Sequence, residues 1–138
     1  MSREPEWLLE TVVLAAHGAL MAEHGGLPGV SDLARLRSAL ARPRNLLAYS
    51  AEPPSLFALA ASYAYGLTRD HCFLDGNKRI ALTAALTFLE INGLRLVAER
   101  EDTYSAMLRL AAGEMSEAEL GAWLAGRCTE TGRLPEPP

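Results

Sequence analysis

The chain has 138 residues, of which 49% are hydrophobic and 22% charged, and its formal net charge is −4. This length suits one domain with a sizeable core, so we expect a single domain spanning residues 1–138. The acidic balance disfavours a protein that binds the nucleic-acid backbone directly, although it is compatible with a small basic site.

The sequence indicates neither a membrane protein nor a disulfide-rich secreted protein. No uncharged apolar run reaches the roughly 18 residues of a membrane span, and the segment from Met1 to Glu6 lacks the features of a signal peptide. Cys72 and Cys128 are too few and too far apart for a disulfide framework or a zinc site. We therefore expect a soluble, cytoplasmic protein with no membrane partner.

Helical periodicity begins near the N-terminus. Apolar residues recur at helical spacing from about Pro5 to His24, and Gly25-Gly26 predicts the end of this first helix. Ser31 is the expected N-cap of a second helix, which is predicted to end near Pro43. The histidines of the first helix, His17 and His24, are expected at the surface.

The middle of the chain contains the most apolar stretch. Helical periodicity is lost between Arg44 and Pro53, and residues 46–50 are predicted to form a loop or a short strand. Ser55 begins a third helix, which ends beside Arg69. The next helix is predicted from about Asn77 to Ile91 and is almost wholly apolar, so we expect it to be buried at the centre of the fold. Asn92-Gly93 predicts its end.

Shorter elements follow the central helix. Residues 94–97 are predicted to form one short strand, and a helix is expected from about Thr103 to Ala112. The spacing of Ser116 and Glu119 predicts a capping box at the start of a last helix. The tail from about Arg127 has three prolines and is expected to be loose. The pattern as a whole predicts an all-α bundle around a buried helix.

A polar loop, residues 71–79, opens the central helix. The first N–H groups of a helix have no intrahelical partner and attract anions, and Lys78 and Arg79 add two positive charges there. Asp75 is the kind of oxygen ligand that Mg²⁺ accepts beside substrate phosphates, and His71 can exchange a proton near neutral pH. Singly, each residue has an ordinary structural explanation, such as helix capping by Asp75. Their combination favours an active site.

The string His71-Cys72-Phe73-Leu74-Asp75-Gly76-Asn77-Lys78-Arg79 resembles the signature of the Fic/Doc superfamily. Fic proteins read H-P-F-x-[DE]-G-N-G-R, whereas Doc (death-on-curing) toxins read H-x-F-x-D-A-N-K-R, so Lys78 indicates the Doc branch. Gly76 departs from the alanine that is usual in those toxins. The segment from His24 to Asp32 also resembles the family's upstream conserved region, and the likeness extends over roughly residues 8–125.

The resemblance implies a compact Fic/Doc-like helical bundle with at most a short β-flap, which we expect at residues 46–50. It also implies ATP and Mg²⁺ as cofactors. In this reading His71 is the catalytic base and Asp75 holds Mg²⁺. The nucleotide phosphates are expected to be bound by the rest of the loop and by a residue of the preceding helix: Gly76, Asn77, Lys78, Arg79 and, as an additional candidate, Arg69.

The resemblance further implies transfer of the γ-phosphate of ATP to a threonine of elongation factor Tu, with arrest of translation. Two alternatives stay open: transfer of AMP, as in Fic relatives with glycine at position 78, and a module that binds a ribosome or a protein without chemistry. The chain has no [ST]-x-x-x-E-[GN] string of the kind with which some Fic proteins inhibit themselves. The expected partner is therefore an antitoxin whose disordered C-terminal segment folds on the toxin.

Overall fold

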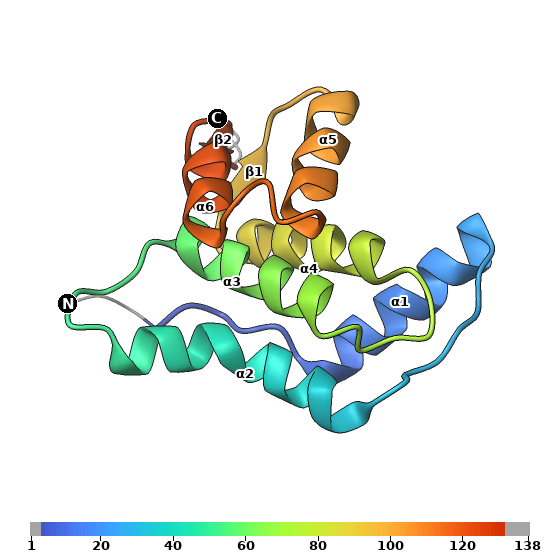
Figure 1. The fold of residues 1–138 in the computed structure, drawn as a ribbon. Coiled ribbons are helices and arrows are strands. Elements are labelled where there is room, and N and C mark those ends of the chain that lie inside the picture. Colours follow the sequence, from blue (N-terminus) through green and yellow to red (C-terminus); the bar gives the residue numbers. More distant parts are fainter. Residues whose placement is uncertain (1–3, 132–138) are drawn as a thin grey trace, which may run out of the picture.

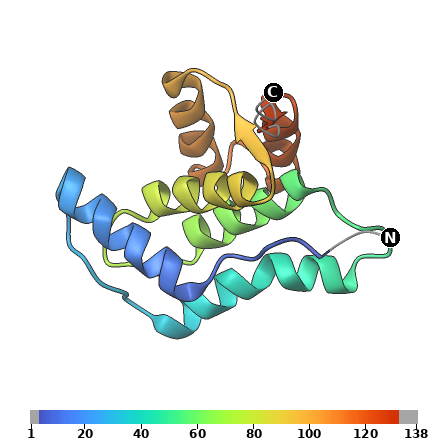
Figure 2. The same cartoon turned by 180° about the vertical axis from the view of Figure 1, so that it is seen from behind.

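The computed structural model describes residues 4–131 and arranges them in three layers. Helices α3 and α4 form the middle layer, with α1 and α2 on one side and α5, α6 and a small sheet on the other (Figures 1 and 2). The elements within these residues are α1 (Glu10–His24), α2 (Leu33–Tyr49), α3 (Leu56–Arg69), α4 (Asn77–Ile91), β1 (Leu94–Leu96), α5 (Arg100–Ala111), α6 (Glu117–Ala125) and β2 (Cys128–Glu130). The predicted all-α bundle is confirmed.

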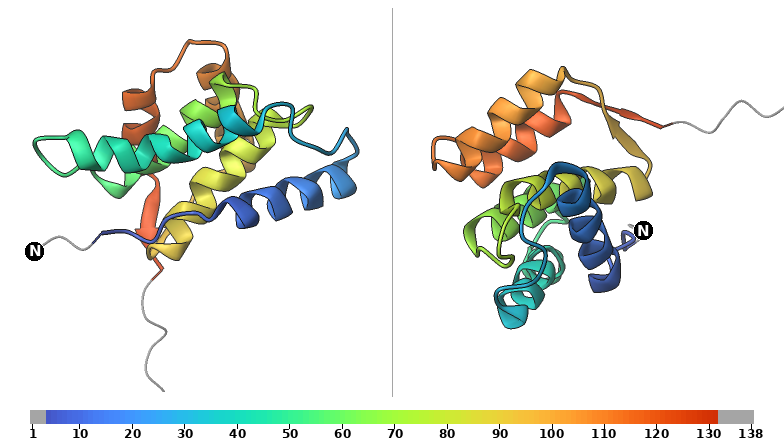
Figure 3. Two further views of the ribbon diagram at one scale, coloured as in Figure 1. Left: turned by 90° about the horizontal axis from the view of Figure 1, so that it is seen from below. Right: turned by 90° about the vertical axis from the view of Figure 1, so that its right-hand side faces the viewer.

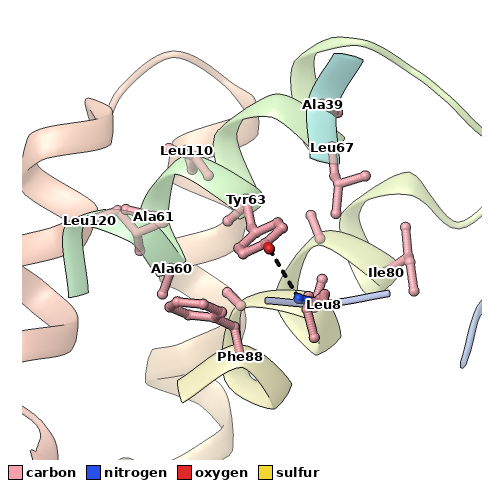
Figure 4. Close-up of a cluster of buried hydrophobic side chains, with 14 of the residues drawn as sticks. Leu8, Ala39, Ala60, Ala61, Tyr63, Leu67, Ile80, Phe88, Leu110 and Leu120 are labelled. Carbon is pink, nitrogen blue, oxygen red and sulfur yellow. Dashed lines mark hydrogen bonds between the residues drawn. The ribbon is translucent and has the colours of Figure 1, made fainter. Parts of the chain in front are cut away.

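The core lies where α3 and α4 meet. Tyr63 of α3 and Phe88 of α4 are fully buried, and their ring centroids are 5.1 Å apart (Figure 4). The Tyr63 hydroxyl accepts a hydrogen bond of 3.2 Å from the backbone N–H of Leu8, so the one polar atom of this ring is satisfied inside the core. Residues 4–9 thus pack as an extended segment rather than as the predicted first turns of α1, which begins only at Glu10.

Helix α4 has the predicted bounds, its C-cap is Asn92, and the next residue, Gly93, has a left-handed φ of 88°. Its position in the middle layer is clear in the view along the bundle (Figure 3, right). The prediction that this helix is buried on all sides is wrong, because Leu82 and Leu86 on one flank are half-buried and Ile91 is 47% exposed. This exposed flank of α4 begins at the polar loop. A surface groove therefore lies next to the loop, where other elements were expected to cover the helix.

Helix α2 differs most from the prediction. Its N-cap is Asp32 rather than Ser31, because the Asp32 carboxylate accepts from the N–H of Arg35 at 3.1 Å. The helix passes through Pro43 and continues to Tyr49, so the predicted loop or flap at residues 46–50 is wrong. A proline inside a helix costs about 3 kcal/mol, but here Pro43 is buried and the turn after it packs Leu46 and Leu47 against the core.

The sheet pairs two strands of three residues. The predicted strand at β1 is confirmed, and β2 runs antiparallel to it with Leu96 opposite Cys128. The tail predicted to be loose from Arg127 is therefore ordered as far as this strand, and the rest of it, residues 132–138, lies outside the described part. At α6 the predicted capping box is present: Ser116 and Glu119 exchange two hydrogen bonds of 3.0 Å. No helix in the described part of the chain is long and apolar enough to cross a membrane.

Candidate functional site

The polar loop joins α3 to α4 and is held by the segment that joins α1 to α2. Both connections lie at the same end of the molecule (Figure 1). The N–H of Ser31 donates to the oxygen of Cys72 at 2.8 Å, and the N–H of Leu74 donates to the oxygen of Gly29 at 3.1 Å. Val30 and Phe73 form an antiparallel β-bridge between the two segments. The β-like pairing beside the loop is therefore made by the glycine-rich segment and not by residues 46–50.

His71 occupies an unusual place in this loop. Its φ is 47°, a left-handed value found at no other non-glycine residue among residues 4–131. Its backbone oxygen accepts from the Ser31 hydroxyl at 2.8 Å, which helps to hold that conformation, while its side chain is exposed. Cys72, the next residue, is fully buried, and burial raises the pKa of its thiol to about 11, so that this thiol stays protonated at neutral pH.

A cleft of about 570 Å³ lies where the first turn of α4 faces α5. All six candidates of the loop itself line it, so the structure brings them together: His71, Asp75, Gly76, Asn77, Lys78 and Arg79. Its other walls come from α1 and the glycine that follows it, from α3, α5 and the flank of α4, and from one further loop residue: Met21, Gly25, Thr68, Leu82, Tyr104, Met107, Leu108, Ala111 and Leu74. An apolar cleft with a few convergent polar groups is typical of a ligand site.

Arg69, the remaining candidate, does not line the cleft. Its Nε donates to Asp70 at 3.1 Å, and its guanidinium lies 5.0 Å from the centre of the Tyr65 ring. These contacts direct it along the outside of α3, where it does not meet the other candidates.

The start of α4 offers an open anion site. Gly76, at φ 72°, precedes the helix, and no side chain caps it. The first intrahelical bond runs from the N–H of Ile80 to the oxygen of Gly76, so the N–H groups of the preceding turn have no intrahelical partner. The side chains of Lys78 and Arg79 are exposed and form no ion pair within the described chain. Free donors and two cations thus converge where phosphates could bind.

Asn77 contributes to this site in a different way. Its Oδ1 accepts from the N–H of Phe73 and its Nδ2 donates to the oxygen of Phe73, both at 3.0 Å. The amide side chain therefore closes the loop on itself. The sequence suggested a phosphate ligand, but this side chain is already paired, and the backbone N–H of Asn77 is the donor that has no intrahelical partner.

The Asp75 carboxylate is oriented by backbone groups and does not cap α4. Oδ1 accepts from the N–H of Gly76 at 2.8 Å, and Oδ2 accepts from the N–H of Leu27 at 3.3 Å. A carboxylate has about four lone-pair sites, so two remain for a cation. The described residues contain no cluster of three or more His, Cys, Asp or Glu side chains that could hold a metal ion.

His17 was predicted at the surface, and this is wrong. The side chain is 2% exposed, its ring stacks on Phe73 at 3.9 Å, and its Nε2 lies 2.8 Å from the backbone oxygen of Asp75. It belongs to the buried stripe of α1, with Val13 and Met21 four residues to either side. This spacing of four residues was the sequence signal that could have predicted the burial of His17. His24 is exposed, as predicted.

Met21 fills the space that two glycines leave open. A Cβ added to Gly76 would lie 2.3 Å from the Met21 methyl carbon, and one added to Gly26 would lie 2.7 Å from its sulfur. The alanine that Doc toxins usually carry at position 76 does not fit here without movement of Met21.

We expect Gly76→Ala to lower the free energy of unfolding by about 1 to 3 kcal/mol, because the new methyl group overpacks the contact with Met21. The left-handed backbone at this position adds about 1 kcal/mol. Met21→Ala in the same chain makes room, so the double variant should lose less than the sum of the two single losses. Urea denaturation of the three variants measures this coupling, and strictly additive losses would contradict the packing explanation.

Thr68 carries a buried hydroxyl without a partner. The residue is 8% exposed, and its Oγ1 forms no hydrogen bond within the described chain. Thr68→Val keeps the shape and removes the unpaired group, so we expect the free energy of unfolding to rise by about 1 kcal/mol. Thermal and urea unfolding check this, and a clear loss of stability would show that the hydroxyl has a partner in solution.

Fold and site together define a helical protein with a His-Asp-Lys-Arg loop at the start of its central helix. A model of the Fic/DOC family matches residues 7–89, and the chain belongs to that family. It is 38% identical over 104 residues to "Protein kinase doc" of Escherichia phage P1, covering 75% of this chain and 81% of the relative. It is 43% identical over 75 residues to "Toxin Doc" of Mycolicibacterium smegmatis (strain ATCC 700084 / mc(2)155), covering 54% of this chain and 58% of the relative. Its similarity within the family is thus to Doc toxins.

Proposed function

We propose that this chain is a Doc-like toxin that transfers the γ-phosphate of ATP to a hydroxyl group of a protein. The proposed acceptor is a threonine of elongation factor Tu, and the proposed outcome is arrest of translation in the cytoplasm. One observation carries this proposal: a single cleft gathers His71, Asp75 and the uncapped first turn of α4. The relative named as a protein kinase supports the choice of phosphoryl transfer.

Each residue of the cleft has a separate role in the proposed transfer. The free N–H groups of the α4 turn bind the phosphates, and Lys78 and Arg79 neutralise charge that develops during transfer. Asp75 would hold Mg²⁺, which supplies further neutralisation of the phosphate oxygens when bound. His71, exposed at the rim, takes the proton from the incoming hydroxyl.

Lys78 favours phosphoryl over adenylyl transfer. It lines the cleft from within the uncapped first turn of α4, with its side chain exposed. A lysine there adds bulk and charge at the mouth of the anion site, and we infer that the triphosphate then presents its γ-phosphorus to the hydroxyl that His71 activates. An antitoxin with a disordered C-terminal segment is the proposed partner that controls this activity.

The mass of the modified acceptor tests the proposal. The protein is incubated with ATP, Mg²⁺ and purified elongation factor Tu or a bacterial lysate, and the acceptor is weighed intact. We expect an increment of roughly 80 Da, that of one phosphate. The much heavier adenylyl adduct would replace the kinase by an AMP transferase that uses the same residues. An unmodified acceptor in a tight complex would favour the binding module instead.

A further inference from the structure

A buried histidine lies directly behind the candidate site. His17 is enclosed between α1 and the loop, with its imidazole stacked on Phe73. Its Nε2 lies 2.8 Å from the backbone oxygen of Asp75, although the two residues are 58 positions apart in the chain. Because a carbonyl oxygen only accepts hydrogen bonds, Nε2 carries the proton and donates it.

The oxygen that His17 binds belongs to the peptide group between Asp75 and Gly76. A peptide group is planar, so the N–H of Gly76 turns together with that oxygen as one unit. The same N–H donates to Oδ1 of Asp75 at 2.8 Å. Two hydrogen bonds and one rigid peptide therefore connect the imidazole of His17 to the carboxylate of Asp75.

This peptide needs an external restraint. Gly76 has no side chain that limits its rotation, and its backbone is in the left-handed region at φ 72°. The Asp75 side chain is exposed, so packing does not hold it, and its second oxygen has only the longer contact of 3.3 Å to Leu27. The bond from His17, whose side chain is only 2% exposed, holds the peptide from the core side.

We propose that His17 is a positioning residue that orients the Asp75 carboxylate toward the metal ion of the bound nucleotide. This inference rests on the proposed function, in which Asp75 would hold Mg²⁺. His17 does not line the cleft, so it acts only through the peptide between Asp75 and Gly76. Partners that orient a metal ligand from behind contribute about 10- to 100-fold to metal affinity.

Two substitutions separate the hydrogen bond from the packing. His17→Phe keeps a flat ring against Phe73 and removes the donor. His17→Gln places an amide nitrogen the same number of bonds from the backbone as Nε2 and so restores a donor. His24→Phe, at the exposed end of the same helix, controls for replacing a histidine of α1 by a larger apolar group.

The deciding measurement is the Mg²⁺ concentration that gives half-maximal binding of ATP, followed by calorimetry without any acceptor. We expect His17→Phe to raise it about 10- to 100-fold, His17→Gln to return it close to the wild-type value, and His24→Phe to leave it unchanged. Turnover at saturating Mg²⁺ should stay near wild type in His17→Phe. Adding His17→Phe to Asp75→Asn should have little further effect, because both changes act through the same carboxylate.

Several results would overturn the inference. One is a folded His17→Phe protein with the wild-type Mg²⁺ requirement. Another is a loss of turnover at saturating Mg²⁺ with that requirement unchanged, because it would assign His17 to the base. If His17→Phe does not fold, His17→Asn replaces it, since its amide is one bond too short to reach Asp75, and the same outcomes apply. If the wild-type protein binds no Mg²⁺ together with ATP, the proposed function itself is contradicted. If wild type and variant bind Mg²⁺ with equal affinity, only the role of His17 is contradicted.

Discussion

His71→Ala is expected to lower the rate of phosphoryl transfer about 10²- to 10⁴-fold, the usual contribution of a general base. The fold should survive this change, because the His71 side chain is exposed and the loop is held through its backbone oxygen, which accepts from Ser31. Alanine adopts a left-handed backbone less often than histidine, so we expect the free energy of unfolding to fall, by about 1 kcal/mol. Growth arrest on expression and transfer of labelled phosphate in vitro both measure the loss.

The control for this variant is His24→Ala, which removes an exposed histidine outside the cleft and should remain fully toxic. Equal toxicity of His71→Ala and the parent protein, at equal expression, would leave the catalytic role without support. Toxicity would then have to come from binding alone, and the non-catalytic module would become the better explanation.

The sequence predicted elements whose signals are local. Helix α4 has the predicted bounds because its end is encoded by Asn92-Gly93, and α6 begins at the predicted capping box of Ser116 and Glu119. Helix α2 was misjudged because a proline argues for a break, whereas burial of Pro43 and of the turn after it outweighs the lost hydrogen bond. Strand β1 was predicted, but its partner β2 was not, because β2 has only three residues and they lie in a stretch that the sequence indicated as a loose tail.

The candidate site was likewise predictable where its signals are local. Its chemistry lies in nine consecutive residues, so the sequence alone could assemble it. What the sequence could not give were the directions of side chains: Asn77 turns inward to clamp Phe73, and Arg69 turns outward to Asp70. His17 was missed for a related reason, because its burial depends on which face of α1 meets the loop. The chemistry of residues that are close together in the chain can be predicted from the sequence, whereas contacts between segments far apart in the chain require the structure.

Asp75→Asn is expected to reduce Mg²⁺-dependent transfer by about 100-fold or more, since even the outer partners of metal ligands contribute about 10- to 100-fold. The substitution preserves the shape of the side chain and removes its charge. Its single amide oxygen can keep the bond from Gly76 or the bond from Leu27, but not both. We therefore expect a stability loss of only about 1 kcal/mol for one exposed hydrogen bond, and so a far larger effect on activity than on folding.

Measuring both quantities on the same protein distinguishes catalysis from scaffolding at Asp75. If the carboxylate only held the loop against Leu27 and Gly76, the variant would unfold more easily but keep its activity per folded molecule. If Asp75 holds the metal ion, activity falls while the melting temperature changes little, and excess Mg²⁺ restores part of the rate. Asp75→Glu serves as the matched control, because it keeps the charge and lengthens the side chain by one methylene. It should therefore retain more Mg²⁺-dependent activity than Asp75→Asn, even if the longer side chain loses its bond to Gly76.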